Sequence, residues 1–118
     1  MSDIGVLEIK KLIQSRRFSL SDEKKLQAEI ETELLAAGIE HKREHRLDAN
    51  NIIDFMIGST GIEVKIKGSK LNIYRQIERY AGFDMIKRLI LVTNVPMGMP
   101  ELVKGKPVYI VNLAKAWL

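Results

Sequence analysis

Two apolar stretches joined by a short turn constrain this chain more than any other part of its sequence. The stretches are residues 52–57 and 62–66, and Gly-Ser-Thr-Gly at 58–61 lies between them. Glycine and serine between two such stretches favour the turn of an antiparallel hairpin. The second stretch alternates strictly, so Glu63 and Lys65 share one face of the predicted strand.

Asp54 is an acid in the middle of the first apolar stretch. Removing a carboxylate from water costs several kcal/mol unless a cation or a hydrogen-bond donor compensates. If Ile57 pairs with Ile62, Asp54 faces Lys65 and lies diagonal to Glu63, at roughly 7–8 Å between Cα atoms. The two carboxylates could then hold one hard cation, with the lysine beside it. A slip of one residue would scatter these side chains over both faces.

Composition limits the classes of protein to which the chain can belong. Its 118 residues suffice for one domain with a real core, and 46% apolar with 29% charged residues is typical of a globular protein. Cysteine is absent, which excludes disulfides, zinc–thiolate sites and thiol catalysis. No signal-peptide pattern is seen, and no apolar run approaches the ~20 residues of a membrane span. We therefore expect a cytoplasmic protein without a membrane partner. The net charge of +4 suits a polyanionic partner.

Local signals predict the remaining elements. An N-cap cluster around Ser19 and Ser21 begins one helix, and Gly38 ends it. A later helix begins after Ser69 and ends at Gly82. We expect helices over residues 3–17, 21–37 and 70–81, and strands over residues 40–47, 87–93 and 108–111, followed by a short amphipathic end with Trp117.

We divide this single domain into an N-terminal basic helical segment, residues 1–20, and the main body, residues 21–118. The first segment could be a basic arm, a dimer contact or, by default, a covering helix. In the main body, Leu-Ile-Leu-Val at 89–92 is typical of a strand buried on both faces. A strand, a helix and a strand of this length fit a crossover to a parallel neighbour. The predicted fold is an α/β domain with a mixed central sheet flanked by helices.

In these residues and in the order of its elements, the chain over residues 21–112 resembles the PD-(D/E)XK nuclease superfamily. Asp54 matches the family's strand aspartate, and Glu63 and Lys65 match its (D/E)-x-K motif, although isoleucine replaces the proline that often precedes the aspartate. The resemblance implies a restriction-endonuclease-like core: a helix, a three-stranded antiparallel meander, a crossover helix and a parallel strand. It also implies Mg²⁺, for which Mn²⁺ could substitute, on Asp54, Glu63 and the Val64 carbonyl, with Lys65 orienting the attacking water.

Two helices supply further candidates within this resemblance. Gln76 and Tyr80 match the Q-x-x-x-Y element of some branches, and they could contact Lys65, a water or a phosphate. The family often adds one acid from the first helix. Gln27 stands where related families tend to place it, Glu23 is the nearest carboxylate on the predicted apolar stripe, and Glu33 lies on the other edge of that stripe. We therefore treat Glu23 as a candidate site residue.

Basic residues surround the predicted site in sequence. Each alone is a solvated charge, but together they offer a rim for phosphates. His41 and His45 share one face of the polar strand and are too far apart to chelate a metal easily, so we expect them to face solvent or phosphate. The candidate nucleic-acid-binding residues are Arg43, Arg46, Lys67, Lys70, Arg75 and Arg79.

The resulting expectation is a Mg²⁺-dependent deoxyribonuclease. It would hydrolyse phosphodiester bonds of double-stranded or branched DNA in repair, recombination or phage DNA processing, and the chain could be phage-encoded. A catalytically silent nuclease fold that binds nucleic acid is one alternative, and a dimeric Holliday-junction or structure-specific endonuclease, with a homodimer expected by analogy only, is another. The third alternative is an ordinary α/β interaction domain with surface ion pairs.

Overall fold

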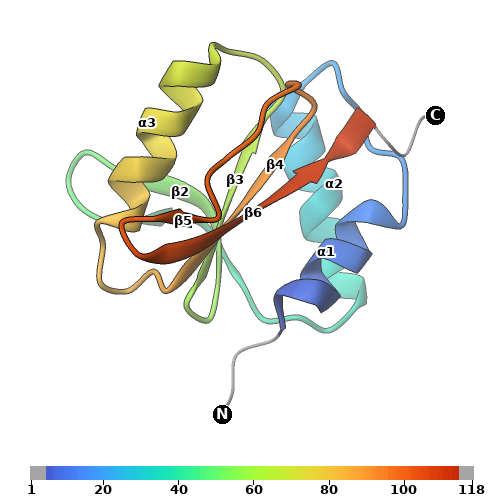
Figure 1. Ribbon diagram of the computed structural model, residues 1–118. Coiled ribbons are helices and arrows are strands. Elements are labelled where there is room, and N and C mark those ends of the chain that lie inside the picture. Colours follow the sequence, from blue (N-terminus) through green and yellow to red (C-terminus); the bar gives the residue numbers. More distant parts are fainter. Residues whose placement is uncertain (1–4, 115–118) are drawn as a thin grey trace.

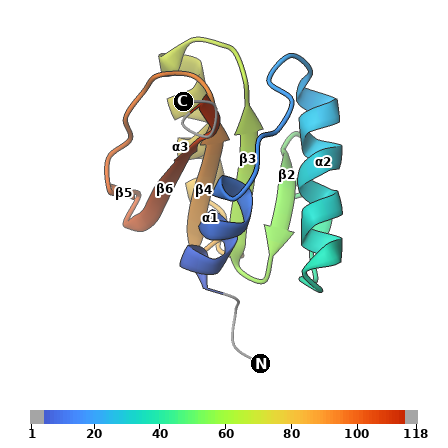
Figure 2. The ribbon, with the colours of Figure 1, turned by 90° about the vertical axis from the view of Figure 1, so that its right-hand side faces the viewer.

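A mixed six-stranded sheet with helices on both faces forms the centre of the molecule, as the computed structural model shows for residues 5–114 (Figure 1). The strands lie in the order β1-β2-β3-β4-β6-β5. Helices α1 and α2 cover one face and α3 covers the other (Figure 2). The helices are α1 (Val6–Gln14), α2 (Glu23–Ala36) and α3 (Lys70–Ala81), and the strands are β1 (Lys42–Arg46), β2 (Ile52–Ile57), β3 (Thr60–Lys65), β4 (Arg88–Thr93), β5 (Leu102–Val103) and β6 (Lys106–Asn112).

Apolar side chains fill both sides of the sheet. Ile90 and Val92 of β4 pack in the cluster under α1 and α2, whereas Leu89 and Leu91 pack in the cluster under α3. This explains the continuous apolar run in β4, because a strand covered on both faces exposes neither set of alternate side chains. The described helices are all too short or too polar to span a membrane.

The connections produce the mixed sheet. β1, β2 and β3 pair antiparallel in chain order, and α3 then carries the chain across so that β4 runs parallel to β3. β6 lies parallel to β4 on its other side. β5, which the sequence did not indicate, adds an antiparallel pair through Leu102 and Val103. Two residues are too few to produce a strand pattern.

The helix ends agree with the predictions in part. Ser69 caps α3 by accepting a hydrogen bond from the Asn72 N–H at 3.1 Å, as predicted. The predicted cap of α2 is wrong, because Asp22 accepts from the N–H groups of Lys24 and Lys25 at 3.0 and 3.2 Å. The helix therefore begins after Asp22 rather than in the serine cluster. Gly38, at φ 71°, ends α2 as predicted.

Helix α1 covers the sheet next to α2. Ile9 and Ile13 are fully buried in the same cluster as Leu26 and Ile30 of α2. This helix therefore covers the sheet, which is the default role expected for the N-terminal helical segment. The helix ends with Ser15 as its C-cap, earlier than the predicted residue 17. Residues 3 and 4 and Trp117 lie outside the described residues.

The β2–β3 hairpin turns more tightly than predicted. Ile57 pairs with Thr60 and Phe55 with Ile62, so the predicted pair of Ile57 with Ile62 is wrong by two residues. Gly58 has φ 57°, which allows a two-residue turn that few other residues tolerate. An even shift keeps every side chain on its predicted face, because successive side chains alternate.

Strand β1 forms one edge of the sheet and carries an unusual backbone. Its register with β2 runs from Lys42 opposite Met56 to Arg46 opposite Ile52. Glu44, in the middle of the strand, has φ 51°, in the left-handed region that a non-glycine residue rarely adopts. The Glu44 carboxylate accepts a hydrogen bond from Lys24 of α2 at 3.1 Å.

Candidate active site

Asp54 and Glu63 meet where β2 and β3 cease to pair through their backbones. The last backbone pair is Phe55 with Ile62, and one step further the same register sets Asp54 opposite Glu63. There Asp54 Oδ2 accepts a hydrogen bond from the Val64 N–H at 2.8 Å, and Glu63 Oε1 accepts one from the Asp54 N–H at 3.3 Å. The two carboxyl groups therefore replace backbone partners across the hairpin, so they are direct rather than diagonal neighbours.

Burial governs the charge of this pair. The Glu63 residue is only 3% exposed. Burial, together with the neighbouring Asp54 charge, raises the pKa of Glu63 to about 9. Burial also raises the pKa of Asp54, and the charge of Glu23 acts in the same direction. The hydrogen bond between the two side chains acts in opposite directions, because it raises the pKa of Glu63 and lowers the pKa of Asp54.

Lys65 lies beside the two acids on the same face of β3. Its ammonium Nζ is 3.6 Å from Glu63 Oε2, the oxygen that the Asp54 N–H does not hold. The Lys65 side chain is 26% exposed, in contrast to the buried glutamate. The Lys65 ammonium is therefore the solvent-accessible member of this ion pair, and the Glu63 carboxyl group is the buried one.

Helix α2 brings one further acid to the site. Glu23 Oε1 accepts a hydrogen bond from the Ile66 N–H at 3.1 Å, immediately after Lys65, and its charge acts on Asp54. Of the other two candidates, Glu33 forms an ion pair with Arg16. Gln27 is 2% exposed, and its Oε1 has no hydrogen-bond partner among the described residues. The helical pattern placed Gln27 only at the edge of the apolar stripe, so its full burial was not foreseen.

Gln76 and Tyr80 form a relay that ends on β2. The Gln76 Nε2 donates to the Tyr80 hydroxyl at 2.9 Å, and that hydroxyl donates to the Ile52 carbonyl at 2.9 Å. Burial and the charge of Glu63 raise the pKa of Tyr80, so its hydroxyl remains a donor. The relay thus holds the backbone two residues before Asp54, a role that the sequence did not indicate.

The predicted basic rim divides into two sets. Arg43 pairs with Glu31 at 3.1 Å, and Arg46 donates to the Ala49 carbonyl at 3.0 Å, so both have partners within the chain. The other four, Lys67, Lys70, Arg75 and Arg79, are exposed on α3 and on the segment that leads to it.

The expectation that His41 faces solvent or phosphate is wrong. Its side chain is 6% exposed, and the two ring nitrogens lie 2.8 Å from Glu31 Oε2 and 3.0 Å from the Ile39 carbonyl. The pairing with Glu31 depends on how α2 packs against β1, which the sequence pattern does not specify.

Comparison with known proteins adds no relative from which a role could be inferred. Neither a protein-family model, nor a curated protein, nor a solved structure significantly matches the chain. Over residues 5–114, no three or more His, Cys, Asp or Glu side chains are arranged to hold a metal ion. The ligand set predicted from the sequence is not such a group of three side chains, because it combines two carboxylates with a backbone carbonyl.

Proposed function

We propose that this protein is a Mg²⁺-dependent deoxyribonuclease that hydrolyses DNA phosphodiester bonds, with Asp54, Glu63 and Lys65 at its active site. One observation carries the proposal: the buried Glu63 carboxyl group meets the half-buried Asp54 carboxyl group, and a lysine lies 3.6 Å from Glu63. Removing two neighbouring acids from water lowers stability unless their charge is compensated. A divalent cation would compensate both charges.

The acids have the chemistry that Mg²⁺ prefers, namely hard oxygen donors. Asp54 Oδ2 and Glu63 Oε1 hold backbone N–H groups, so Asp54 Oδ1, Glu63 Oε2 and the Val64 carbonyl would be the ligands. When bound, Mg²⁺ would polarise a phosphoryl oxygen and lower the pKa of a water molecule. The two backbone hydrogen bonds fix both carboxyl groups in place before a cation arrives.

The remaining side chains act by position and charge. Lys65 would donate a hydrogen bond to the attacking water or to a phosphate oxygen, which offsets charge that develops in the transition state. Glu23 holds the chain just after Lys65, and Tyr80 holds β2 just before Asp54. Anchors on both strands limit the movement of the reacting groups, and misplacement by about 1 Å can cost about 100-fold in rate.

The element order also supports the proposal. A helix, three antiparallel strands, a crossover helix and a parallel strand follow one another in α2, β1–β3, α3 and β4. The nuclease superfamily that the sequence resembles has the same order. The exposed lysines and arginines on and before α3, with the net charge of +4, suit a DNA backbone.

A cleavage assay tests the proposal. Supercoiled plasmid and labelled linear, nicked, single-stranded and branched DNA are incubated with the protein in Mg²⁺, Mn²⁺ or EDTA. We expect cleavage with either metal, and a loss of at least about 1,000-fold in Asp54→Asn and Glu63→Gln. Glu101→Gln, an exposed acid at the opposite edge of the sheet, is the matched control and should cut normally. Cleavage by Asp54→Asn at the wild-type rate refutes the site, and a wild type that binds DNA without cutting it indicates the silent alternative.

A further inference from the structure

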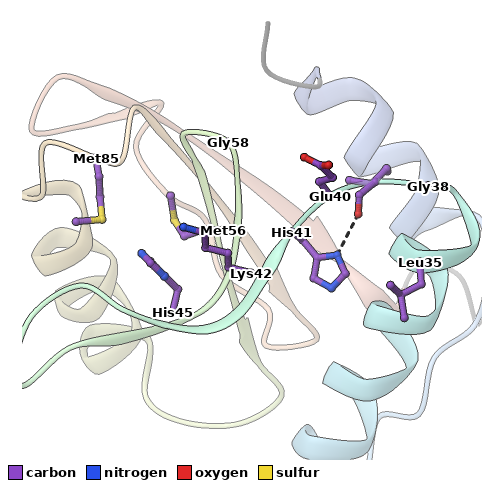
Figure 3. Close-up of a pocket in the computed structure, with 10 residues that line it drawn as sticks. Leu35, Gly38, Glu40, His41, Lys42, His45, Met56, Gly58 and Met85 are labelled. Carbon is purple, nitrogen blue, oxygen red and sulfur yellow. Dashed lines mark hydrogen bonds between the residues drawn. The ribbon is translucent and has the colours of Figure 1, made fainter. Parts of the chain in front are cut away.

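A surface pocket of about 780 Å³ lies where β1 begins and where the β2–β3 hairpin turns (Figure 3). Met56 of β2, Lys42 and His45 of β1, and Met85 of the segment after α3 gather on one side of it (Figure 3). None of these four residues belongs to the site described above. The pocket is large enough for a ligand of the size of a nucleotide.

The pocket lies one short step from the proposed active site. Met56 follows Asp54 by two residues on β2, which places their Cα atoms roughly 7 Å apart. By alternation the two side chains point to the same face of the sheet. Glu63 points to that face as well, because its neighbours Ile62 and Val64 both pack under α1 and α2. Met56, which lines the pocket, therefore lies on the same face of the sheet as the two acids and roughly 7 Å from Asp54 along β2.

The lining matches the two parts of a nucleotide. Met56 is 6% exposed and Met85 is 45% exposed, so the pocket contains one buried and one accessible thioether group. Thioethers contact aromatic rings favourably and adapt to their shape. Lys42 lies opposite Met56 on the neighbouring strand, where its ammonium could pair with a phosphate. His45 lies opposite Ile53 and adds a ring that can stack or donate a hydrogen bond.

We propose that this pocket holds one unpaired nucleotide of the DNA strand that is cut at Asp54 and Glu63. The base lies against Met56 and Met85, and Lys42 contacts the adjoining phosphate. A base inside a duplex is paired and stacked and cannot enter a side pocket without being extruded. The preferred substrate is therefore single-stranded or forked at the cut, rather than fully paired. This inference rests on the proposed nuclease function and specifies its substrate.

Binding by a cleavage-deficient protein tests this without relying on activity. Asp54→Asn is titrated with three DNAs of one sequence (single-stranded, forked and blunt duplex), each with 2-aminopurine at the position next to the proposed cut. We expect single-stranded and forked DNA to bind at least about 10-fold more tightly than duplex, on the scale of one stacked base. The 2-aminopurine emission should change on binding of these two and not of the duplex.

Second-site variants locate the effect in the pocket. Adding Met85→Ala or His45→Ala should lower affinity for forked DNA by about 10-fold and leave duplex affinity unchanged. Lys42→Gln removes the exposed cation that is proposed to contact the adjoining phosphate and should also lower affinity for forked DNA. Leu102→Ala, exposed on the opposite edge of the sheet, is the control that should change nothing. Equal affinity for forked and duplex DNA, unaffected by Met85→Ala, overturns the pocket assignment but not the nuclease, provided that wild-type cleavage depends on Asp54. A protein that binds none of the three DNAs overturns both.

Discussion

Replacing Glu63 by glutamine should stabilise the metal-free protein, and increasingly so as pH rises. The folded protein keeps this carboxyl protonated up to a pKa of about 9, whereas the unfolded chain ionises it near the ordinary value of 4.5. Between pH 4.5 and pH 9 the unfolded state ionises this group and the folded state does not, so rising pH lowers the free energy of unfolding. In linkage terms, the contribution of Glu63 to stability is fully present below pH 4.5 and is lost as pH rises toward 9.

The magnitude follows from the width of this window. Each pH unit within it costs the wild type at most about 1.4 kcal/mol, so the loss between pH 4.5 and pH 7 is up to about 3 kcal/mol. Glu63→Gln cannot ionise and so avoids this loss. Its amide oxygen can still accept from the Asp54 N–H, and its amide nitrogen can donate to the Asp54 carboxyl as the protonated acid does.

Urea denaturation in EDTA at pH 5, 7 and 8.5 measures the effect. The free energy of unfolding of Glu63→Gln minus that of the wild type should be small at pH 5 and should rise by up to about 4 kcal/mol by pH 8.5. Glu101→Gln should show a flat difference, since that side chain is exposed. A difference that is flat for Glu63→Gln as well, or that falls with pH, refutes the account of a buried, protonated carboxyl group.

Three other changes test the site and the sheet that carries it. Lys65→Ala should lower cleavage by about 100- to 1,000-fold while DNA binding in Ca²⁺, followed by anisotropy, persists; Lys11→Ala is the matched control. Tyr80→Phe should cost about 1–2 kcal/mol in chemical denaturation, because the Ile52 carbonyl loses its donor, and Tyr80→Ala about 3–5 kcal/mol, because the buried ring is also lost. Gly61→Ala should lower stability by about 1–3 kcal/mol, since its Cβ would lie 2.6 Å from the Ile53 Cδ1; an unchanged melting temperature contradicts this packing.

Local sequence signals predicted the elements better than they predicted the contacts between them. Ser69 caps α3 through its own side chain and Gly82 is its C-cap, so both ends follow from local residues. The apolar run of β4 likewise identifies a doubly covered strand without reference to its neighbours. The register of the hairpin was wrong because it depends on the conformation of Gly58, and four turn residues allow more than one turn. The pattern did establish which face the acids share, because that depends only on alternation.

The contacts that could not be predicted are long-range. Glu23 meets Ile66 across 43 positions, and Tyr80 meets the Ile52 carbonyl across 28. The pairing of Glu31 with His41 joins α2 to β1 and removes an expected solvent-facing ring. Such contacts depend on how a helix rotates over the sheet, and a helical stripe more than 100° wide leaves that rotation undetermined.

The left-handed turn of the backbone at Glu44 has a consequence for assembly. A sheet that ends in a regular strand presents a ready template on which the sheet of a second molecule can continue. In β1 the residue at the centre departs from extended geometry, and four of the five residues, Lys42, Arg43, Glu44 and Arg46, carry charge. If two copies paired along this edge, like charges would lie close together, and the backbone hydrogen bonds between the copies would be interrupted at the middle of the strand. We therefore expect a homodimer of this chain to use another surface, which would leave the border of the molecule next to the proposed nucleotide pocket accessible.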